Sequence, residues 1–115
     1  MYKIGEFSKI VNIPVRTLRY YDDYGILVPK ECDQYTGYRY YSDQNIEECN
    51  LIVLLKSLNF SLEEIRIYKD NLTSEVFDNK RKELEDKIDT MKLQCEELKQ
   101  LSDSLKTKTY SKYIK

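Results

Sequence analysis

Apolar residues recur at helical spacing along most of the chain, and the interruptions between them mark the predicted elements. In the opening segment IGEFSKIV (4–11), the apolar positions share one side of a helix, and they are Ile4, Phe7, Ile10 and Val11. Asn12 can end this helix in a left-handed conformation. Pro14 suits the first turn of a second helix, where its missing N–H costs nothing. Two short helices separated by about three residues predict a helix-turn-helix.

The second helix, 14–24, separates into two faces on a helical wheel. Pro14, Leu18 and Tyr21 cluster on one side and are expected to pack on the first helix. The opposite side faces outward and carries Arg16, Arg19, Tyr20 and Asp23. Tyr20 is compatible with either a buried or an exposed position. Gly25 is expected to end the helix as its C′ residue.

A β-hairpin is predicted directly after the helix pair. Gly37 supplies a turn position with positive φ, and the Asp33 side chain can accept hydrogen bonds from the turn backbone. Val28 and the segment 38–41 flank this turn with residues that favour strands. A hairpin in this place is the arrangement called a wing.

Helices are predicted for most of the remaining chain. Ser42 is expected to cap a third helix that ends near residue 58, and apolar residues almost surround this helix, which predicts a central place in the core. These residues are Ile46, Cys49, Leu51, Ile52, Val53, Leu54, Leu55 and Leu58. Ser61 and Glu64 fit a capping box at the start of a fourth helix.

From about residue 74 onward, the apolar positions thin to a narrow seam whose spacings alternate between four and three. The seam consists of Leu84, Ile88, Met91, Cys95, Leu98, Ser102 and Leu105. Such a heptad seam is too narrow to stabilise a lone helix in water. We therefore expect these residues to form a dimer interface with a second copy of the chain. The alternative is a helix that folds back on its own domain.

The predicted fold class is mainly α. It is a winged helix-turn-helix with a small β-hairpin wing, followed by a helix pair and a long C-terminal coiled-coil helix. The formal net charge is only -1, from 19 Lys and Arg against 20 Asp and Glu. A nucleic-acid partner would therefore require positive charge to be focused locally, since no global excess exists.

Composition disfavours an enzyme. The chain has no histidine, which removes the commonest general base and the commonest metal ligand. Its three cysteines, Cys32, Cys49 and Cys95, have no close pair, so we expect reduced thiols and neither a disulfide framework nor a metal site. No catalytic residue and no cofactor are predicted.

No membrane association is predicted either. The longest apolar run, LIVLL (51–55), is far below the roughly 20 residues that a membrane-spanning helix needs. Nothing at the N-terminus resembles a signal peptide, because Lys3 and Glu6 appear within the first six residues. The expected compartment is the cytoplasm.

Four segments together resemble the MerR family of transcription regulators: IGEFSKIVNI (4–13), VRTLRYYDDYGIL (15–27), DQYTGYRYYS (33–42) and NFSLEEI (59–65). The resemblance implies a homodimer joined by an antiparallel coiled coil. It also implies binding to a pseudo-palindromic operator in double-stranded promoter DNA, distortion of that DNA, and RNA polymerase as a partner. The domains would be a winged helix-turn-helix DNA-binding domain (1–72), a dimerisation helix (73–106) and a tail (107–115).

The sequence departs from the family pattern in three places. Pro14 stands where relatives often have Ser, and Gln34 replaces the proline that is common in the wing turn. The chain stops soon after the coiled coil, and TKTYSKYIK (107–115) holds neither the paired cysteines of metal-sensing relatives nor the added domain of drug-sensing relatives.

A recognition helix places its N-terminal residues against base edges in the major groove. Val15, Arg16 and Thr17 occupy that position, and Arg16 is the best candidate for bidentate contact with guanine. Arg19 and Tyr20 are expected to contact phosphates and set the register. For Arg19, an ion pair with a nearby aspartate of the same helix is the alternative.

On the wing, Tyr38 and Tyr40 share one face, while Arg39 and Tyr41 share the other. The resemblance implies that Tyr38, Arg39 or Tyr40 grips DNA, and the pattern leaves open which face does so. Lys56 is a further phosphate candidate, with a solvated lysine as the alternative.

Two alternative functions remain open at this point. One is a DNA-architectural or recombination-accessory protein with the same winged fold, and the other is a coiled-coil adaptor that binds proteins. Cys95 is expected to act as a small apolar residue of the seam. A redox-sensitive contact across the dimer is its alternative role.

Overall fold

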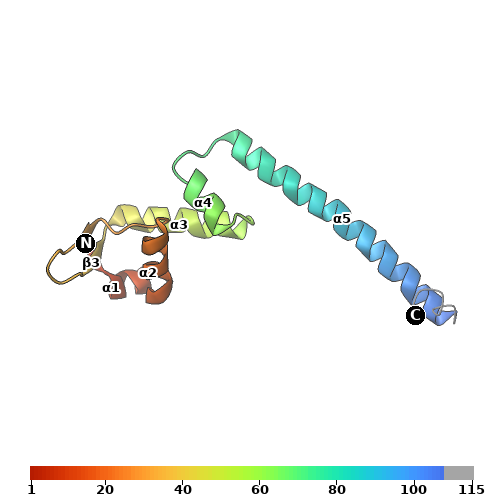
Figure 1. Ribbon diagram of the computed structural model, residues 1–115, viewed down its shortest axis with the longest axis horizontal. Helices are drawn as coiled ribbons and strands as arrows, with labels where there is room; N and C mark the ends of the chain where they lie inside the picture. The colour runs from red at the N-terminus through yellow and green to blue at the C-terminus, as the bar shows by residue number, and fades with distance from the viewer. Residues whose placement is uncertain (108–115) are drawn as a thin grey trace. The chain divides into compact units, whose positions relative to one another are not determined.

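The computed structural model describes residues 1–107 of the chain, which divides into two compact units, Met1–Leu72 and Thr73–Lys115. The first unit contains β1 (Tyr2–Lys3), α1 (Ile4–Val11), α2 (Val15–Tyr24), β2 (Glu31–Cys32), β3 (Arg39–Tyr41), α3 (Asp43–Ser57) and α4 (Leu62–Tyr68) (Figure 1). The second unit contains α5 (Ser74–Lys106). The predicted fold class is confirmed. Of the predicted tail, residues 108–115 lie outside the described part of the chain.

The turn between α1 and α2 is largely as predicted. Asn12 ends α1 in the left-handed conformation with φ 57°. Pro14 differs from the prediction, because it is the N-cap of α2 with φ -57° and ψ 144°, and the helix begins at Val15. Its extended ψ leaves the Pro14 carbonyl free to accept the first helical hydrogen bond from the Leu18 N–H at 3.1 Å.

The two faces of α2 are confirmed except at Pro14, which is exposed. Leu18 and Tyr21 are buried in the core. The outward set of Arg16, Arg19, Tyr20 and Asp23 is exposed. Tyr20, for which both positions were open, is 46% exposed, and its ring packs edge-on against Tyr24 with centroids 5.7 Å apart.

The wing belongs to a three-stranded antiparallel sheet in the order β1-β3-β2. Strand β3 pairs with β1 through Tyr2–Tyr41 and Lys3–Tyr40, and with β2 through Glu31–Tyr40 and Cys32–Arg39. The sequence pattern did not indicate β1. It also placed the first strand of the hairpin too early, because the exposed Val28 precedes β2 and is not part of it.

The wing turn has the predicted chemistry. Gly37 has φ 74°, which a residue with a side chain rarely adopts. The Asp33 carboxylate accepts hydrogen bonds from the backbone N–H groups of Tyr35 (2.8 Å) and Thr36 (3.1 Å). These two hydrogen bonds lower the pKa of Asp33, because they stabilise its charged form.

Helix α3 buries one face and not its whole circumference. Cys49, Ile52 and Leu55 are fully buried, whereas Val53 and Leu54 are about half exposed. The central position predicted for this helix is therefore wrong in part. Too few elements exist in the first unit to cover a helix on every side, so the apolar run extends onto the surface.

Asn45 is a buried polar residue that joins α3 to the segment before the wing. Its amide oxygen accepts from the Ser42 N–H at 2.9 Å, and its Nδ2 donates to the Val28 carbonyl at 3.0 Å. The Ser42 hydroxyl in turn accepts from the Asn45 N–H, which completes the predicted cap. These bonds fix the start of α3 against the segment that leads into the wing.

The C-terminal end of α2 is joined to α4. The Tyr24 hydroxyl donates a hydrogen bond to Glu63, and Arg66 forms an ion pair with the same carboxylate at 2.7 Å. The Arg66 guanidinium also lies over the Tyr24 ring, 5.2 Å from its centroid. The predicted capping box of Ser61 and Glu64 starts α4 and so supports this contact.

Helix α5 is 33 residues long, and its N-cap is Thr73, whose side chain accepts from the Val76 N–H. Among residues 1–107, none of the helices combines the length and the apolar character that crossing a bilayer would require.

Candidate nucleic-acid interface

A hollow of about 500 Å³ lies between the start of α1, the outer face of α2 and the wing. Four cationic side chains line it: Lys3, Lys9, Arg19 and Arg39. The remaining lining consists of Ile4, Gly5, Glu6, Gly37 and Tyr38. We call this feature the basic hollow. Groups from three separate parts of the first unit therefore meet at one site, although the whole chain has a net charge of -1.

The wing contributes Tyr38 and Arg39, which lie in different environments. Arg39 is half-buried, and its Nε donates to the Asp22 carboxylate at 2.7 Å. This hydrogen bond is the main cause of a raised pKa at Arg39. Tyr38 is exposed, and the Lys3 ammonium lies over its ring, 5.1 Å from the centroid. Asp22 therefore holds the Arg39 guanidinium at the edge of the hollow.

The two faces of the wing differ in packing. Tyr41 is fully buried and stacks on Phe7, with centroids 4.3 Å apart and an interplanar angle of 12°. The Arg39 and Tyr41 face therefore points toward α1 and α2, whereas Tyr38 and Tyr40 lie on the outer face. Tyr40 is half-buried within the sheet.

The recognition-helix candidates differ in their access to a ligand. Arg16 is exposed, while Val15 and Thr17 are half-buried at the start of α2. Arg19 lies one turn further along and reaches the basic hollow. Within residues 1–107, Arg19 has no ion pair with Asp22, which pairs with Arg39 instead. Arg19 therefore keeps its charge available at the hollow.

Lys56 lies outside the basic hollow. It is exposed on α3, and its ammonium donates to the Tyr21 hydroxyl at 3.4 Å. The contact directs Lys56 toward the end of α2 and not toward the wing.

Lys3 and Lys9 were not predicted as site residues. Both had ordinary surface positions in the sequence, at the start and on the polar side of the first helix. They reach the hollow because β1 pairs with β3 and brings the start of α1 beside the wing. The sequence pattern gave no signal for them, because residues six apart do not share one side of a helix.

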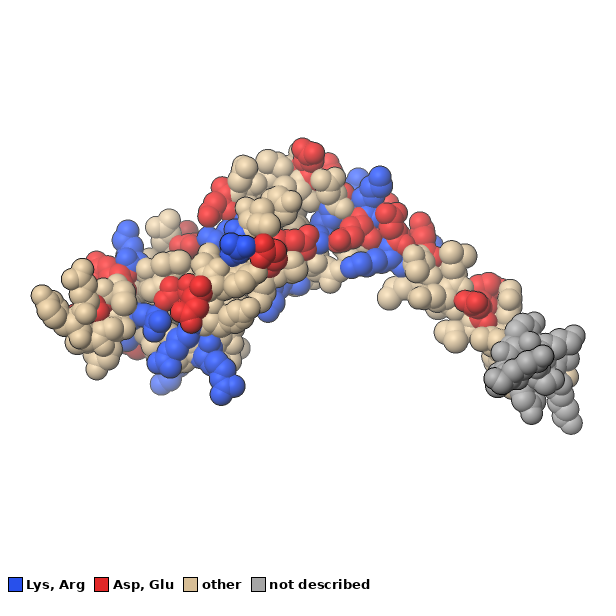
Figure 2. Space-filling model, in the orientation of Figure 1, with Lys and Arg blue, Asp and Glu red and all other residues tan. Residues whose placement is uncertain are grey.

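The charged surface agrees with this arrangement. Figure 2 shows Lys and Arg side chains gathered at the lower left, where α1 and α2 lie in Figure 1. A local concentration of positive charge is what a phosphate backbone requires when the net charge is near zero.

Helix α5 presents the predicted seam as an open surface. Leu84 is half-buried, and the other six seam residues are exposed. Leu98, for example, is 65% exposed. Cys95 is a free, exposed thiol in the middle of the seam. Exposure of an apolar stripe along one helix is consistent with a partner that covers it.

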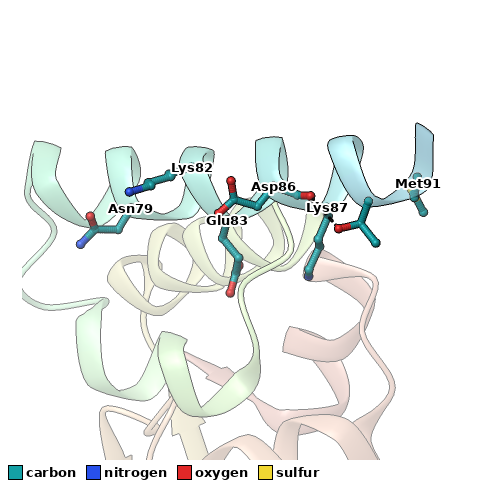
Figure 3. A pocket seen from close by; sticks show the side chains of 7 residues that line it. Asn79, Lys82, Glu83, Asp86, Lys87 and Met91 are labelled. Atoms are coloured by element: carbon teal, nitrogen blue, oxygen red, sulfur yellow. Dashed lines mark hydrogen bonds between the residues drawn. The ribbon is translucent and has the colours of Figure 1, made fainter. Parts of the chain in front are cut away.

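A second hollow, of about 570 Å³, lies along α5 (Figure 3). Its lining residues are Asn79, Lys82, Glu83, Asp86, Lys87, Thr90 and Met91. All seven belong to one helix and include two lysines and two carboxylates, so no single ligand chemistry is favoured. Within the described residues, no group of three or more His, Cys, Asp or Glu side chains could hold a metal ion.

Two helices joined by a tight turn, a wing and a basic hollow between them define a winged helix-turn-helix protein. The sequence pattern of the MerR HTH family of regulatory proteins matches residues 2–72. Because this match covers more than half of the chain, the protein belongs to that family.

The multidrug-efflux transporter 1 regulator of Bacillus subtilis is 40% identical over 76 residues, which is 66% of this chain and 27% of that protein. MtaN, the N-terminus of the Bacillus subtilis multidrug transporter activator, superimposes with a TM-score of 0.78 and 25% identity, over 87% of this chain and 96% of that chain. EcmrR, in a cryo-EM structure of the EcmrR–DNA complex in EcmrR-RPo, gives a TM-score of 0.76 and 28% identity, over 98% of this chain and 41% of that chain. The chain spans about a quarter of the length of the first curated relatives that it matches.

Proposed function

We propose that this protein is a sequence-specific, DNA-binding transcription regulator of the MerR type. It binds a pseudo-palindromic promoter operator as a homodimer and distorts the DNA. The observation that carries the proposal is the basic hollow, where Lys3, Lys9, Arg19 and Arg39 surround a space open to an anionic ligand. A solved DNA complex of the similar protein EcmrR supports the same assignment.

In this proposal, the basic hollow and the recognition helix have separate tasks. Cations of the hollow, together with Tyr20, Tyr38 and Tyr40, contact the DNA backbone and fix the position of the domain. Arg16 reads a guanine, flanked by Val15 and Thr17 at the start of α2. Lys56 contributes a further phosphate contact from α3.

The homodimer is proposed on the seam of α5. Burying a leucine or isoleucine side chain contributes roughly 1.5–3 kcal/mol, and several such residues together offset the entropy cost of association. In an antiparallel coiled coil, Leu84, Ile88, Met91, Cys95, Leu98, Ser102 and Leu105 would meet their counterparts. A twofold pair of recognition helices then matches two half-sites of an operator.

Partners and compartment follow from this role. A regulator that distorts promoter DNA acts on RNA polymerase, and such a protein works in the cytoplasm. We propose no catalytic step and no cofactor, since the relatives named above are regulators. The alternative function, a DNA-architectural or recombination-accessory protein, has no support from these relatives.

The test is selection of binding sites from a random-sequence duplex library with the purified chain, followed by footprinting. We expect a pseudo-palindromic site and an affinity that falls steeply with salt, with a slope of about -0.9 per phosphate contact. A chain that dimerises but shows no salt-dependent DNA affinity would contradict the proposal and favour the adaptor function. A site at a recombination sequence and not in a promoter would favour the architectural function.

A further inference from the structure

Tyr41 carries a buried hydroxyl that has no hydrogen-bond partner among the described protein groups. Its side chain is 0% exposed, and its ring stacks on Phe7 in the core. A phenylalanine would make the same ring contact without burying a polar atom. Buried hydroxyl groups without a partner are rare, because they lose hydrogen bonds to water and gain none. Packing alone therefore does not explain why this position is a tyrosine and not a phenylalanine.

The surroundings of this hydroxyl are charged. Burial, the largest cause, and the negative charge of Asp22 raise the pKa of Tyr41 to about 12, while Arg39 and Arg19 oppose this shift. The hydroxyl thus keeps its proton at neutral pH and is available as a donor. Arg39 and Tyr41 share one face of β3, and Arg39 both donates to Asp22 and lines the basic hollow. The Tyr41 side chain therefore lies on the same side of the wing as Asp22 and the hollow.

The Asp22 carboxylate depends on Arg39 for its hydrogen bond. Within residues 1–107, its carboxylate receives its side-chain hydrogen bond from Arg39 alone. A phosphate that enters the basic hollow competes with Asp22 for the same guanidinium. When Arg39 turns to the phosphate, the part-buried carboxylate loses its donor, and this loss opposes DNA binding unless another donor takes its place.

We propose that Tyr41 is a positioning residue for DNA binding, whose hydroxyl donates to Asp22 when a DNA phosphate in the basic hollow draws Arg39 away. The free protein keeps the hydroxyl without a partner, and the bound protein uses it. We call this replacement of Arg39 by Tyr41 as the donor to Asp22 the exchange. It rearranges hydrogen bonds only, and the bound phosphate is the only charge that is added. It links the wing, through β3, to the recognition helix, which carries Asp22. This inference rests on the proposed DNA-binding function.

The test is a double-mutant cycle on affinity for the duplex selected by the wild-type chain, using Tyr41→Phe, Asp22→Asn and the double variant. Tyr41→Phe should leave the melting temperature of the free protein unchanged or higher, because only an unpaired hydroxyl is removed. It should weaken DNA binding by about tenfold to hundredfold, the loss expected for one hydrogen bond to a charged group. In the Asp22→Asn background, Tyr41→Phe should have no effect on affinity, because no carboxylate then needs a replacement donor.

Tyr2→Phe is the matched control. Its hydroxyl already donates to Asp43 at 2.7 Å and gains nothing when DNA binds, so its DNA affinity should equal that of the wild type. NMR of the wild-type chain supplies a second measurement that needs no variant. The Arg39 Nε–H resonance should move on addition of DNA.

The outcomes separate the two proposals. If the wild-type chain binds no DNA, both the proposed function and the exchange are overturned. If the wild type binds and Tyr41→Phe binds equally well, only the exchange is overturned. The exchange also fails if Tyr41→Phe weakens binding equally in both backgrounds, if it destabilises the free protein, or if the Arg39 resonance stays unchanged in the complex.

Discussion

Arg16 and Arg39 carry the same charge but are held in different ways. Arg16 is exposed at the start of α2 and has no ion pair within residues 1–107, so its long side chain can adapt to a base edge. Arg39 is half-buried and already oriented by Asp22. In the proposed function, Arg16 contacts a base edge from the start of the recognition helix, and Arg39 contacts a phosphate from the wing after it leaves Asp22. The proposal therefore assigns base readout to Arg16 and a backbone contact to Arg39.

Arg16→Ala tests the assignment of base readout. We expect it to remove about 1–3 kcal/mol of discrimination between the selected duplex and a scrambled duplex. Titrations of both duplexes by fluorescence anisotropy measure this ratio. Arg19→Ala is the matched control on the same helix, because loss of a phosphate contact should weaken both duplexes alike. An unchanged ratio for Arg16→Ala, with the dimer intact, would remove Arg16 from the readout.

The cysteines permit a prediction on accessibility. Burial raises the pKa of the Cys49 thiol to about 11, which leaves almost no reactive thiolate at neutral pH. Cys32 is exposed on the wing. A thiol reagent followed by mass spectrometry should therefore modify Cys32 rapidly and Cys49 only when the first unit unfolds. Equal rates for both thiols in the folded protein would contradict the packing of α3.

At the scale of elements, helix ends were the most predictable feature. Asn12, Gly25, Ser42 and Ser61 each act through local hydrogen bonds or a local backbone conformation, so a few residues suffice to specify them. Strand β1 was not predictable, because its two residues are ordered by pairing with β3, far away in the sequence. Local pattern cannot reveal such a strand.

The same distinction applies to the basic hollow. Arg19, Tyr38 and Arg39 were predicted because the helix and the hairpin that carry them have strong local signals. Lys3 and Lys9 join the site only through the pairing of β1. The ion pair between Arg39 and Asp22 also depends on the tertiary contact between the wing and α2.

Leu98→Asp tests the seam of α5. A buried carboxylate without a partner opposes association strongly, so we expect sedimentation to give a monomer. Leu93→Asp is the matched control. Leu93 is 73% exposed on the same helix but lies off the seam, so this variant should remain a dimer. Ile88→Asp provides a second seam position. A dimer that persists in both seam variants would refute the interface.

On the scale of the whole molecule, positive and negative charges are nearly equal in number, but positive charge is concentrated at one site. Residues 1–59 hold seven Lys and Arg against eight Asp and Glu, and the remainder holds twelve of each. Four of those seven cations nevertheless line the basic hollow. Acidic residues elsewhere reduce attraction to DNA that does not fit, because they oppose binding wherever the hollow is not engaged.

Dimerisation should double the number of phosphates that the molecule contacts, and the salt dependence of binding measures that number. Each contact contributes about -0.9 to the slope of log affinity against log salt. We therefore expect Leu98→Asp, as a monomer, to bind the selected duplex with about half the slope of the wild type. Leu93→Asp, which keeps the dimer, should retain the full slope. A monomer with the full slope would mean that one subunit makes all the backbone contacts, and the twofold arrangement of basic hollows on the operator would then be wrong.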